Sequence, residues 1–165
     1  MAHNPLFASA SLLPTTDIHL MNLNVLSILG FMILIVAIAG LLLTHSLIAD
    51  APVLLSLQFL ALFLMVWARI TFGRRSFHAS ARPTEGGLVT SGPYRFIRHP
   101  IYAAVLYFIW IGALAHISPS SILLLVAGTA GSFLRIIAEE KLLLERYPEY
   151  AAYSAQTKRI IPFML

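Results

Sequence analysis

Four apolar segments, separated by short polar stretches, are the feature that most constrains this chain. They cover residues 25–43, 52–68, 100–115 and 120–134. A helix over the first segment, with 19 residues and Ser27 as its only polar side chain, is long enough to cross a bilayer. Only 11% of the residues are charged, against about 25% in an average soluble domain. The sequence therefore predicts an all-α, polytopic membrane protein and excludes a soluble or disordered chain.

The connections between these segments predict two helical hairpins. Residues 44–51 join the first pair, and residues 116–120 join the second pair, whose short segments span only with snorkelling flanks or a thinned bilayer. The tail, residues 138–165, has apolar and aromatic residues at spacings of three and four, typical of an amphipathic helix. Pro148 is expected to kink or split this helix. The expected fold is one domain over residues 1–165, with four transmembrane helices and a cytoplasmic amphipathic C-terminal helix.

The basic residues predict the orientation. Six of the 11 Lys and Arg residues lie between the second and third segments, and five follow the fourth. The positive-inside rule puts both stretches, and with four spans both termini, in the cytoplasm. This explains the net charge of +4, so we expect no nucleic-acid partner. Residues 1–24 have no basic n-region, so no secretory signal is expected.

The residue types that are missing from this sequence exclude several classes of site and disfavour others. There is no Cys, hence no disulfide, thiolate metal site or Cys nucleophile. The histidines have no metal-ligand spacing, and we expect no metal site. The apolar segments contain no Asp, Glu, Lys or Arg, unlike most transporters and channels. Because the polar residues gather at the cytoplasmic ends, a site there would let a soluble reactant meet a lipophilic one.

One polar cluster precedes the third segment. Pro100 suits the first position of a helix, so Arg98 and His99 would lie at its N-terminus, where free N–H groups and the dipole favour an anion. Tyr102 lies on the same side, three residues after His99. This arrangement predicts a cationic pocket for a carboxylate or phosphate. Alternatively, Arg95 and Arg98 are topology anchors and Tyr102 is an interface aromatic residue.

A second cluster follows the fourth segment. Arg135 and Glu139 are four residues apart and can pair on one helix face. Glu140 is rotated by about 100° and needs another partner. It either binds a cationic ligand or pairs with Arg95 or Arg98, and both alternatives stay open. Small residues four apart on this segment indicate close helix packing.

Both clusters belong to runs that resemble known signatures. Residues 88–102 resemble the first signature of the isoprenylcysteine carboxyl methyltransferase and phospholipid methyltransferase superfamily. The tail, with Glu139-Glu140, Tyr147-Pro-Glu-Tyr150 and Ile161-Pro162, resembles the second signature. The resemblance covers about residues 51–162. It departs at Ala104, where the family often has Gly.

The resemblance implies an integral membrane enzyme that uses S-adenosylmethionine. The positions that it implies for the cofactor are His99, Pro100, Tyr102, Glu140, Tyr94 and Leu88, and those for catalysis are Arg98, Glu139 and Tyr102. Methyl transfer to a lipophilic acceptor is expected, with the carboxylate of an isoprenyl-cysteine-like thioether as the first choice of acceptor. The alternative is a phospholipid (ethanolamine) N-methyltransferase. Less favoured are a reductase-like relative that uses NADPH and a non-enzymatic membrane scaffold.

Overall fold

The computed structural model describes residues 15–73 and 87–162 of the chain. In these residues the regular structure is helical. The helices are α1 (Thr15–Leu43), α2 (Pro52–Phe72), the short 3₁₀ helix η2 (Gly92–Arg95), α3 (Pro100–Ala115), α4 (Pro119–Arg146) and α5 (Tyr150–Gln156). The expectation of an all-α fold is confirmed for the described part of the chain.

Three of the helices are long and apolar enough to cross a membrane, which makes this a multi-pass membrane protein. They are α1 from Leu20 onward, α2 and α4. α3 is apolar but has 16 residues, fewer than the roughly 20 that span a bilayer without tilt or thinning. α2 exposes apolar side chains on its outer face, where Phe63, Val66, Trp67 and Ile70 line a groove of about 260 Å³. Such an exposed apolar face is expected where lipid takes the place of water.

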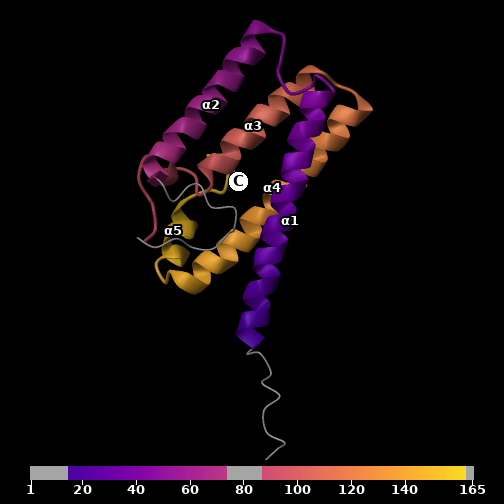
Figure 1. Ribbon diagram of the computed structural model, residues 1–165. Coiled ribbons are helices and arrows are strands. Elements are labelled where there is room, and N and C mark those ends of the chain that lie inside the picture. The colour runs from indigo at the N-terminus through magenta and orange to yellow at the C-terminus, as the bar shows by residue number, and fades with distance from the viewer. Residues whose placement is uncertain (1–14, 74–86, 163–165) are drawn as a thin grey trace, which may run out of the picture.

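The helices pair in a different way from the predicted two hairpins. α3 and α4 form the second hairpin, as expected, but α1 packs mainly along α4, and α2 mainly along α3 (Figure 1). The short connection after α1 therefore joins two helices that pack on different partners. The first hairpin was predicted from the short connection between its two segments, but the shapes of the helix surfaces decide which helices pack together.

Two facing glycines explain why α1 follows α4 so closely. A methyl group added at Gly30 would lie 2.5 Å from the carbonyl oxygen of Gly131. One added at Gly131 would lie 2.6 Å from the carbonyl oxygen of Gly30. No Cβ fits at such distances, so the two backbones approach at a point where only hydrogen atoms separate them. Gly128 and Ser132 are also buried, which confirms the packing role predicted for the small residues of this helix.

A buried glutamine fixes the connection between α1 and α2. Gln58 of α2 is 1% exposed, and its Nε2 donates to the carbonyl oxygens of Leu47 at 2.8 Å and Phe108 at 3.0 Å. Its Oε1 accepts from the N–H of Ala49 at 3.0 Å. These bonds hold the connection against both α2 and α3, and they satisfy an amide that would otherwise be costly to bury.

The predicted boundary between the fourth span and the tail helix was wrong. α4 continues without a break from Pro119 to Arg146, because residues 135–146 are mostly good helix formers and contain no Gly or Pro. The helix ends at Tyr147, which is extended (φ −122°, ψ 104°), as expected before Pro148. α5 follows, so the predicted split at Pro148 is confirmed. Glu139 and Glu140 therefore lie on a rigid extension of a membrane helix.

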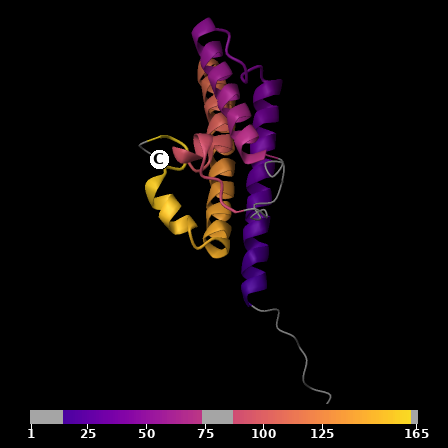
Figure 2. The same ribbon diagram turned by 90° about the vertical axis from the view of Figure 1, so that its left-hand side faces the viewer.

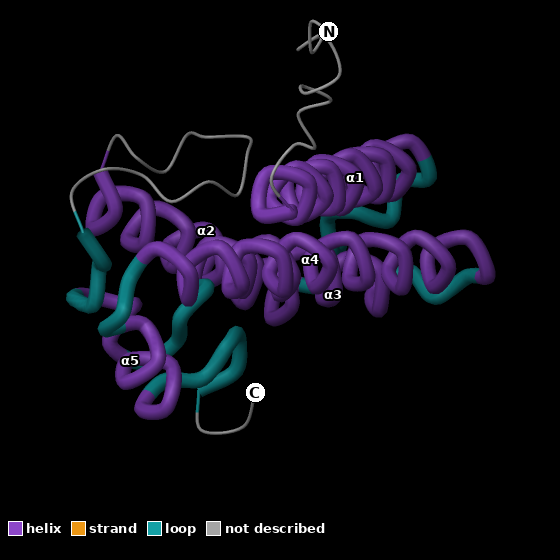
Figure 3. Tube along the Cα trace, turned by 90° about the horizontal axis from the view of Figure 1, so that it is seen from below, coloured by secondary structure: helices purple, strands orange, loops and turns teal. Residues whose placement is uncertain are grey.

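The C-terminal residues form a layer on the opposite side of α4 from α1. Figures 2 and 3 show α4 between α1 and α5, with the stretch after α5 returning toward the start of α3. This stretch joins the bundle through a parallel bridge between Lys158 and Ile97. Ile160, which is fully buried, anchors it in the core. The start of α3 and the end of α4 are therefore brought together under this layer.

Candidate functional site

The N-terminus of α3 is the first element of the site. His99 is the N-cap residue and Pro100 takes the first helical position, as predicted. The N–H of Arg98 donates to the carbonyl oxygen of Lys158 at 2.6 Å, and the N–H of His99 donates to that of Arg159 at 3.0 Å. The N-terminus of this helix was predicted to favour an anion, and in this structure the C-terminal stretch takes the N–H groups of the two residues before Pro100.

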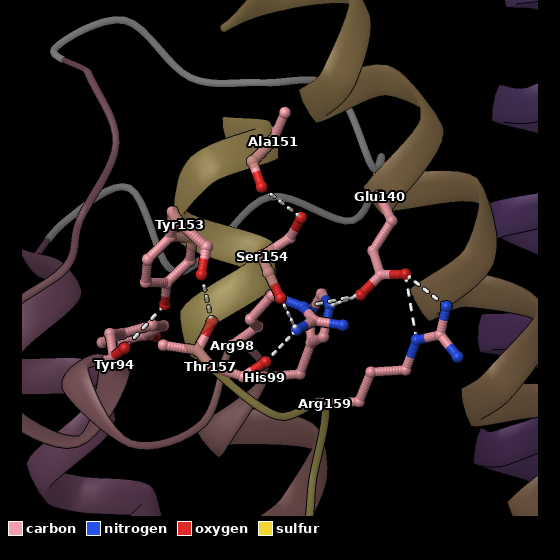
Figure 4. Close-up of polar contacts among 9 residues, drawn as sticks. All are labelled: Tyr94, Arg98, His99, Glu140, Ala151, Tyr153, Ser154, Thr157 and Arg159. Atoms are coloured by element: carbon pink, nitrogen blue, oxygen red, sulfur yellow. Dashed lines mark hydrogen bonds and ion pairs between the residues drawn. The ribbon is translucent and has the colours of Figure 1, made fainter. Parts of the chain in front are cut away.

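A buried carboxylate lies directly beside this terminus. Glu140 is 8% exposed, and its Oε1 accepts from Nε of Arg98 at 2.9 Å and lies 3.3 Å from Nε2 of His99. Its Oε2 accepts from Nε of Arg159 at 3.0 Å and lies 2.9 Å from Nη2 of the same side chain. Figure 4 shows these side chains converging on the carboxylate. We call Arg98, His99, Glu140 and Arg159 the Glu140 cluster.

The ion pairs of the Glu140 cluster are strong because the carboxylate is buried and its partners are charged. A carboxylate removed from water is costly unless charged donors compensate it, and here the guanidinium groups of Arg98 and Arg159 do so. In return, the hydrogen bonds to Glu140 raise the pKa of Arg159. The Arg98 side chain has further partners, because its Nη1 donates to the carbonyl oxygens of Ser154, at 2.8 Å, and Thr157.

A second cluster lies on another face of α4. The Tyr102 hydroxyl donates to Oε2 of Glu139 at 2.9 Å and accepts from Nε of Arg135 at 2.5 Å. Arg135 is 6% exposed, and its Cζ lies 4.8 Å from the centre of the Phe31 ring of α1. A guanidinium over an aromatic face is attracted by the ring quadrupole. We call Phe31, Tyr102, Arg135 and Glu139 the Glu139 cluster.

Three tyrosines wall the site on the side of α5. Burial raises the pKa of Tyr94 and of Tyr150, and it raises the pKa of Tyr153 to about 12. The Tyr153 hydroxyl donates to the carbonyl oxygen of Tyr94 at 2.7 Å (Figure 4). The Tyr150 hydroxyl is buried and, within the part of the chain that the structure describes, has no hydrogen-bond partner. Burial is the main cause of the raised pKa of Tyr150, and the negative charge of Glu140 adds to it.

The structure divides the predicted site residues between these clusters. It brings Arg98 and His99 to Glu140, and Tyr102 to Glu139. Of the alternatives left open for Glu140, the structure shows the pair with Arg98, while Arg95 is exposed. The predicted Arg135–Glu139 pair is joined by the Tyr102 hydroxyl, which bonds to both side chains.

The remaining predicted residues lie at the margin. Pro100 is buried at the first turn of α3, where it shapes the helix start. Tyr94 is 5% exposed, and its ring lies 5.5 Å from the Phe72 ring of α2, so it packs between α2 and α5. Leu88 is half-buried ahead of η2 and takes no part in the polar contacts of either cluster.

Arg159 is the residue that sequence reasoning missed. In the sequence it contributes only to the charge asymmetry of the tail. Its contact with Glu140 spans 19 residues and depends on the pairing of residues 158–159 with residues 97–99. No local spacing rule predicts such a pairing. The only available signal was an arginine just before the Ile161-Pro162 pair of the second signature.

The comparison with protein families decides the identity of this arrangement. The model described as phospholipid methyltransferase matches residues 52–150, more than half of the chain. The chain belongs to the phospholipid methyltransferase family. This family is part of the superfamily that the two signatures resemble, so that prediction is confirmed. The match includes α2, α3, all of α4 and both glutamates, whereas α1 and residues 151–165 lie outside it.

Individual relatives say less about this chain than the family match does. This chain is 30% identical over 113 residues to the cobalt-zinc-cadmium resistance protein CzcN of Cupriavidus metallidurans. The aligned region covers 68% of this chain. The chain spans about half, 50%, of the length of that relative. No solved structure matches the chain.

The donor set of the site fits the cofactor that this family generally uses, S-adenosylmethionine. That molecule carries an ammonium and a carboxylate on one carbon, together with ribose hydroxyls. Glu140 is an acceptor for an ammonium, and the N–H groups of Arg98 and His99 are donors for a carboxylate. Among the described residues the buried Tyr150 hydroxyl has no partner, so it is available to bond a further polar group.

Proposed function

We propose that this family member is an S-adenosylmethionine-dependent methyltransferase whose acceptor is the amine of a membrane phospholipid. The observation that carries the proposal is the family match over residues 52–150, which contains both glutamates and the α3 N-terminus. The family description favours the phospholipid amine over the isoprenyl-cysteine carboxylate that we first expected.

The proposal includes an orientation. We infer that α3 crosses the bilayer with the three longer helices, and that the ends bearing both clusters face the cytoplasm. The support is the placement of all 11 Lys and Arg residues on that side of the predicted topology. In this arrangement a soluble cofactor reaches the site from the cytoplasm, and a lipid acceptor reaches it from the bilayer.

Under this proposal the Glu140 cluster holds the cofactor. Glu140 would bind its ammonium, and Arg98 and His99 would bind its carboxylate, while Pro100 shapes the wall of the pocket at the start of α3. Tyr102 borders this region, since its ring lies 5.7 Å from the His99 ring. Tyr94 and Leu88 would contribute to the wall of the pocket.

The Glu139 cluster would act on the acceptor. When bound, the cofactor supplies a methyl group on a sulfonium sulfur, which keeps the S–C electrons as the acceptor nitrogen forms the N–C bond. The nitrogen must lose a proton to have a free lone pair, and Glu139 is the carboxylate that we assign to accept it. Tyr102 occupies only Oε2 of Glu139 and thereby holds the carboxylate in place. Positioning supplies much of the catalysis in such a transfer, about 7–11 kcal/mol for well-oriented reactants.

A labelled-methyl assay tests this proposal. Purified protein in lipid vesicles receives methyl-labelled S-adenosylmethionine with phosphatidylethanolamine or with an N-acetyl-S-farnesylcysteine acceptor. We expect label in the phospholipid fraction that mild alkali does not release as methanol, because an N-methyl bond is stable where a methyl ester is hydrolysed. Label released by alkali as methanol would assign a carboxylate acceptor instead and return the isoprenyl-cysteine class to first place.

A matched pair of variants identifies the residues. Glu139→Gln should lower turnover while leaving cofactor affinity near that of the unmodified protein. Glu145→Gln, an exposed residue on the same helix, is the control. Equal turnover in both variants would remove Glu139 from catalysis.

A further inference from the structure

The C-terminal stretch occupies, all at once, the groups that the proposed function assigns to the amino-acid part of the cofactor. The carbonyl oxygens of Lys158 and Arg159 take the N–H groups of Arg98 and His99, at 2.6 and 3.0 Å. The guanidinium of Arg159 takes the outer oxygen of Glu140, Oε2. One dipeptide thus satisfies both the anion-binding donors and the cation-binding acceptor.

The partners of Glu140 are not equally bound. Arg98 is held by two further carbonyl oxygens, and its side chain is 10% exposed. The His99 side chain is 3% exposed. The Arg159 side chain is 43% exposed, and the contacts identified for it go to Glu140. Arg159 is therefore the partner that an incoming cation can replace without uncovering a buried charge.

The fold holds the dipeptide in place from its far end. Ile160 is fully buried in the core, and its carbonyl oxygen accepts from the Tyr107 hydroxyl at 2.5 Å. On the near side, the N–H of Lys158 lies 3.4 Å from the carbonyl oxygen of Phe96, a long hydrogen bond. The stretch is thus anchored at Ile160 on one side and, through the carbonyl oxygen of Thr157, at Arg98 on the other. The half-exposed guanidinium of Arg159 lies between these anchors and can leave while they stay.

We propose that residues 158–159 form an intramolecular latch, in which Arg159 and two backbone carbonyls act as a built-in competitor of the cofactor's amino-acid group. The latch rests on the proposed function. Cofactor binding requires the latch to open, because Oε2 of Glu140 already lies against two nitrogens of Arg159 and each of the two N–H groups already donates to a carbonyl oxygen. A latched fraction of about nine-tenths weakens the apparent cofactor affinity about tenfold.

Calorimetric titration of the purified full chain in detergent with S-adenosylmethionine tests the latch. Arg159→Gln removes the competing cation, so we expect affinity to rise about tenfold. Arg159→Lys keeps the charge but loses the bidentate geometry, so its cofactor affinity should lie between those of the unmodified protein and Arg159→Gln. Lys141→Gln is the matched control, because it makes the same charge change on an exposed side chain of α4 outside the latch and should leave affinity unchanged. Unchanged or weaker binding by Arg159→Gln would overturn the latch, since Arg159 would then serve only to position Glu140.

Hydrogen exchange supplies a second readout that does not depend on turnover. If the latch opens, adding cofactor to the unmodified protein should speed amide exchange in residues 157–161. Slower exchange there would show a lid that closes on the cofactor, and would overturn displacement. Normal cofactor binding with either negative result leaves the methyltransferase proposal standing. Absence of binding in the unmodified protein and in all three variants would end the proposed function and the latch with it.

Discussion

Two consecutive glutamates on one helix have different environments. Glu139 bonds to Tyr102 of α3, whereas Glu140 faces away from it and gathers Arg98, His99 and Arg159. A rotation of about 100° per residue is sufficient for this division. Neighbouring like charges are thus held apart, each by its own cationic or hydroxyl partners. The two carboxylates are then available for two different roles.

The charge of Glu140 should matter for both binding and stability. Glu140→Gln leaves two guanidinium groups without their anion. The free energy of unfolding should therefore fall by roughly 3 kcal/mol or more, as for a broken buried ion pair, and the thermal unfolding temperature in detergent should fall with it. Cofactor affinity should fall about 10- to 150-fold, because a charge-assisted hydrogen bond is lost. Calorimetric titration and thermal unfolding of the same preparation measure the two effects. His99→Ala should lose affinity with a smaller change in stability, since it removes one of three partners.

At the scale of elements, the contact between α1 and α4 depends on the absence of side chains. Gly30 faces the backbone of α4, whereas Gly40 on the same helix faces the tip of the Leu124 side chain, at 2.7 Å from an added methyl group. A flexible side chain can move aside, but a helix backbone cannot do so without separating the two helices. The same substitution at these two positions therefore probes one helix in two different settings.

We expect Gly30→Ala to destabilise the protein by about 1–3 kcal/mol through overpacking. Gly40→Ala should change stability by less than about 1 kcal/mol, because the better helix propensity of Ala offsets the shift of Leu124. Thermal unfolding in detergent compares the two. If Gly30→Ala is as stable as Gly40→Ala, the close backbone contact between α1 and α4 does not determine their packing.

The packing of α5 predicts a dependence on alkaline pH. Burial raises the pKa of Tyr153 to about 12, above the value of about 10 in an unfolded chain. Between these values the folded state keeps a proton that the unfolded state has lost, so stability falls as pH rises from about 10 to 12, and is unaffected below this window. Thermal unfolding between pH 8 and 11.5 should show a shallower decline for Tyr153→Phe. Parallel curves for the two proteins would mean that Tyr153 titrates normally.

At the scale of the whole molecule, both polar clusters lie at one end of an apolar bundle, and the polar connections at the other end carry no Lys or Arg. This asymmetry predicts which end faces the cytoplasm. The absence of Cys lets single cysteines report the sidedness of each end without a background signal.

Ile117→Cys and Ser91→Cys are suitable reporters, because Ile117 is 74% exposed in the α3–α4 connection and Ser91 is exposed beside η2. An impermeant maleimide applied to intact cells should label Ile117→Cys only, and both variants should react after permeabilisation. Labelling of Ser91→Cys in intact cells would invert the topology and put the cofactor site on the wrong side for a cytoplasmic cofactor.

The sequence by itself determined the membrane class, the start and end of α3 and the helix break before Pro148, because these depend on local composition and on proline geometry. It also identified Arg98, His99, Tyr102, Glu139 and Glu140, through their place at helix ends and the resemblance of their runs. Only the tertiary structure decided that α1 packs along α4, that Tyr102 bonds to both Arg135 and Glu139, and that Arg159 binds Glu140. These contacts join residues far apart in the chain. Their partners are selected by backbone approach at glycines and by competition among buried charges, neither of which leaves a periodic pattern in the sequence.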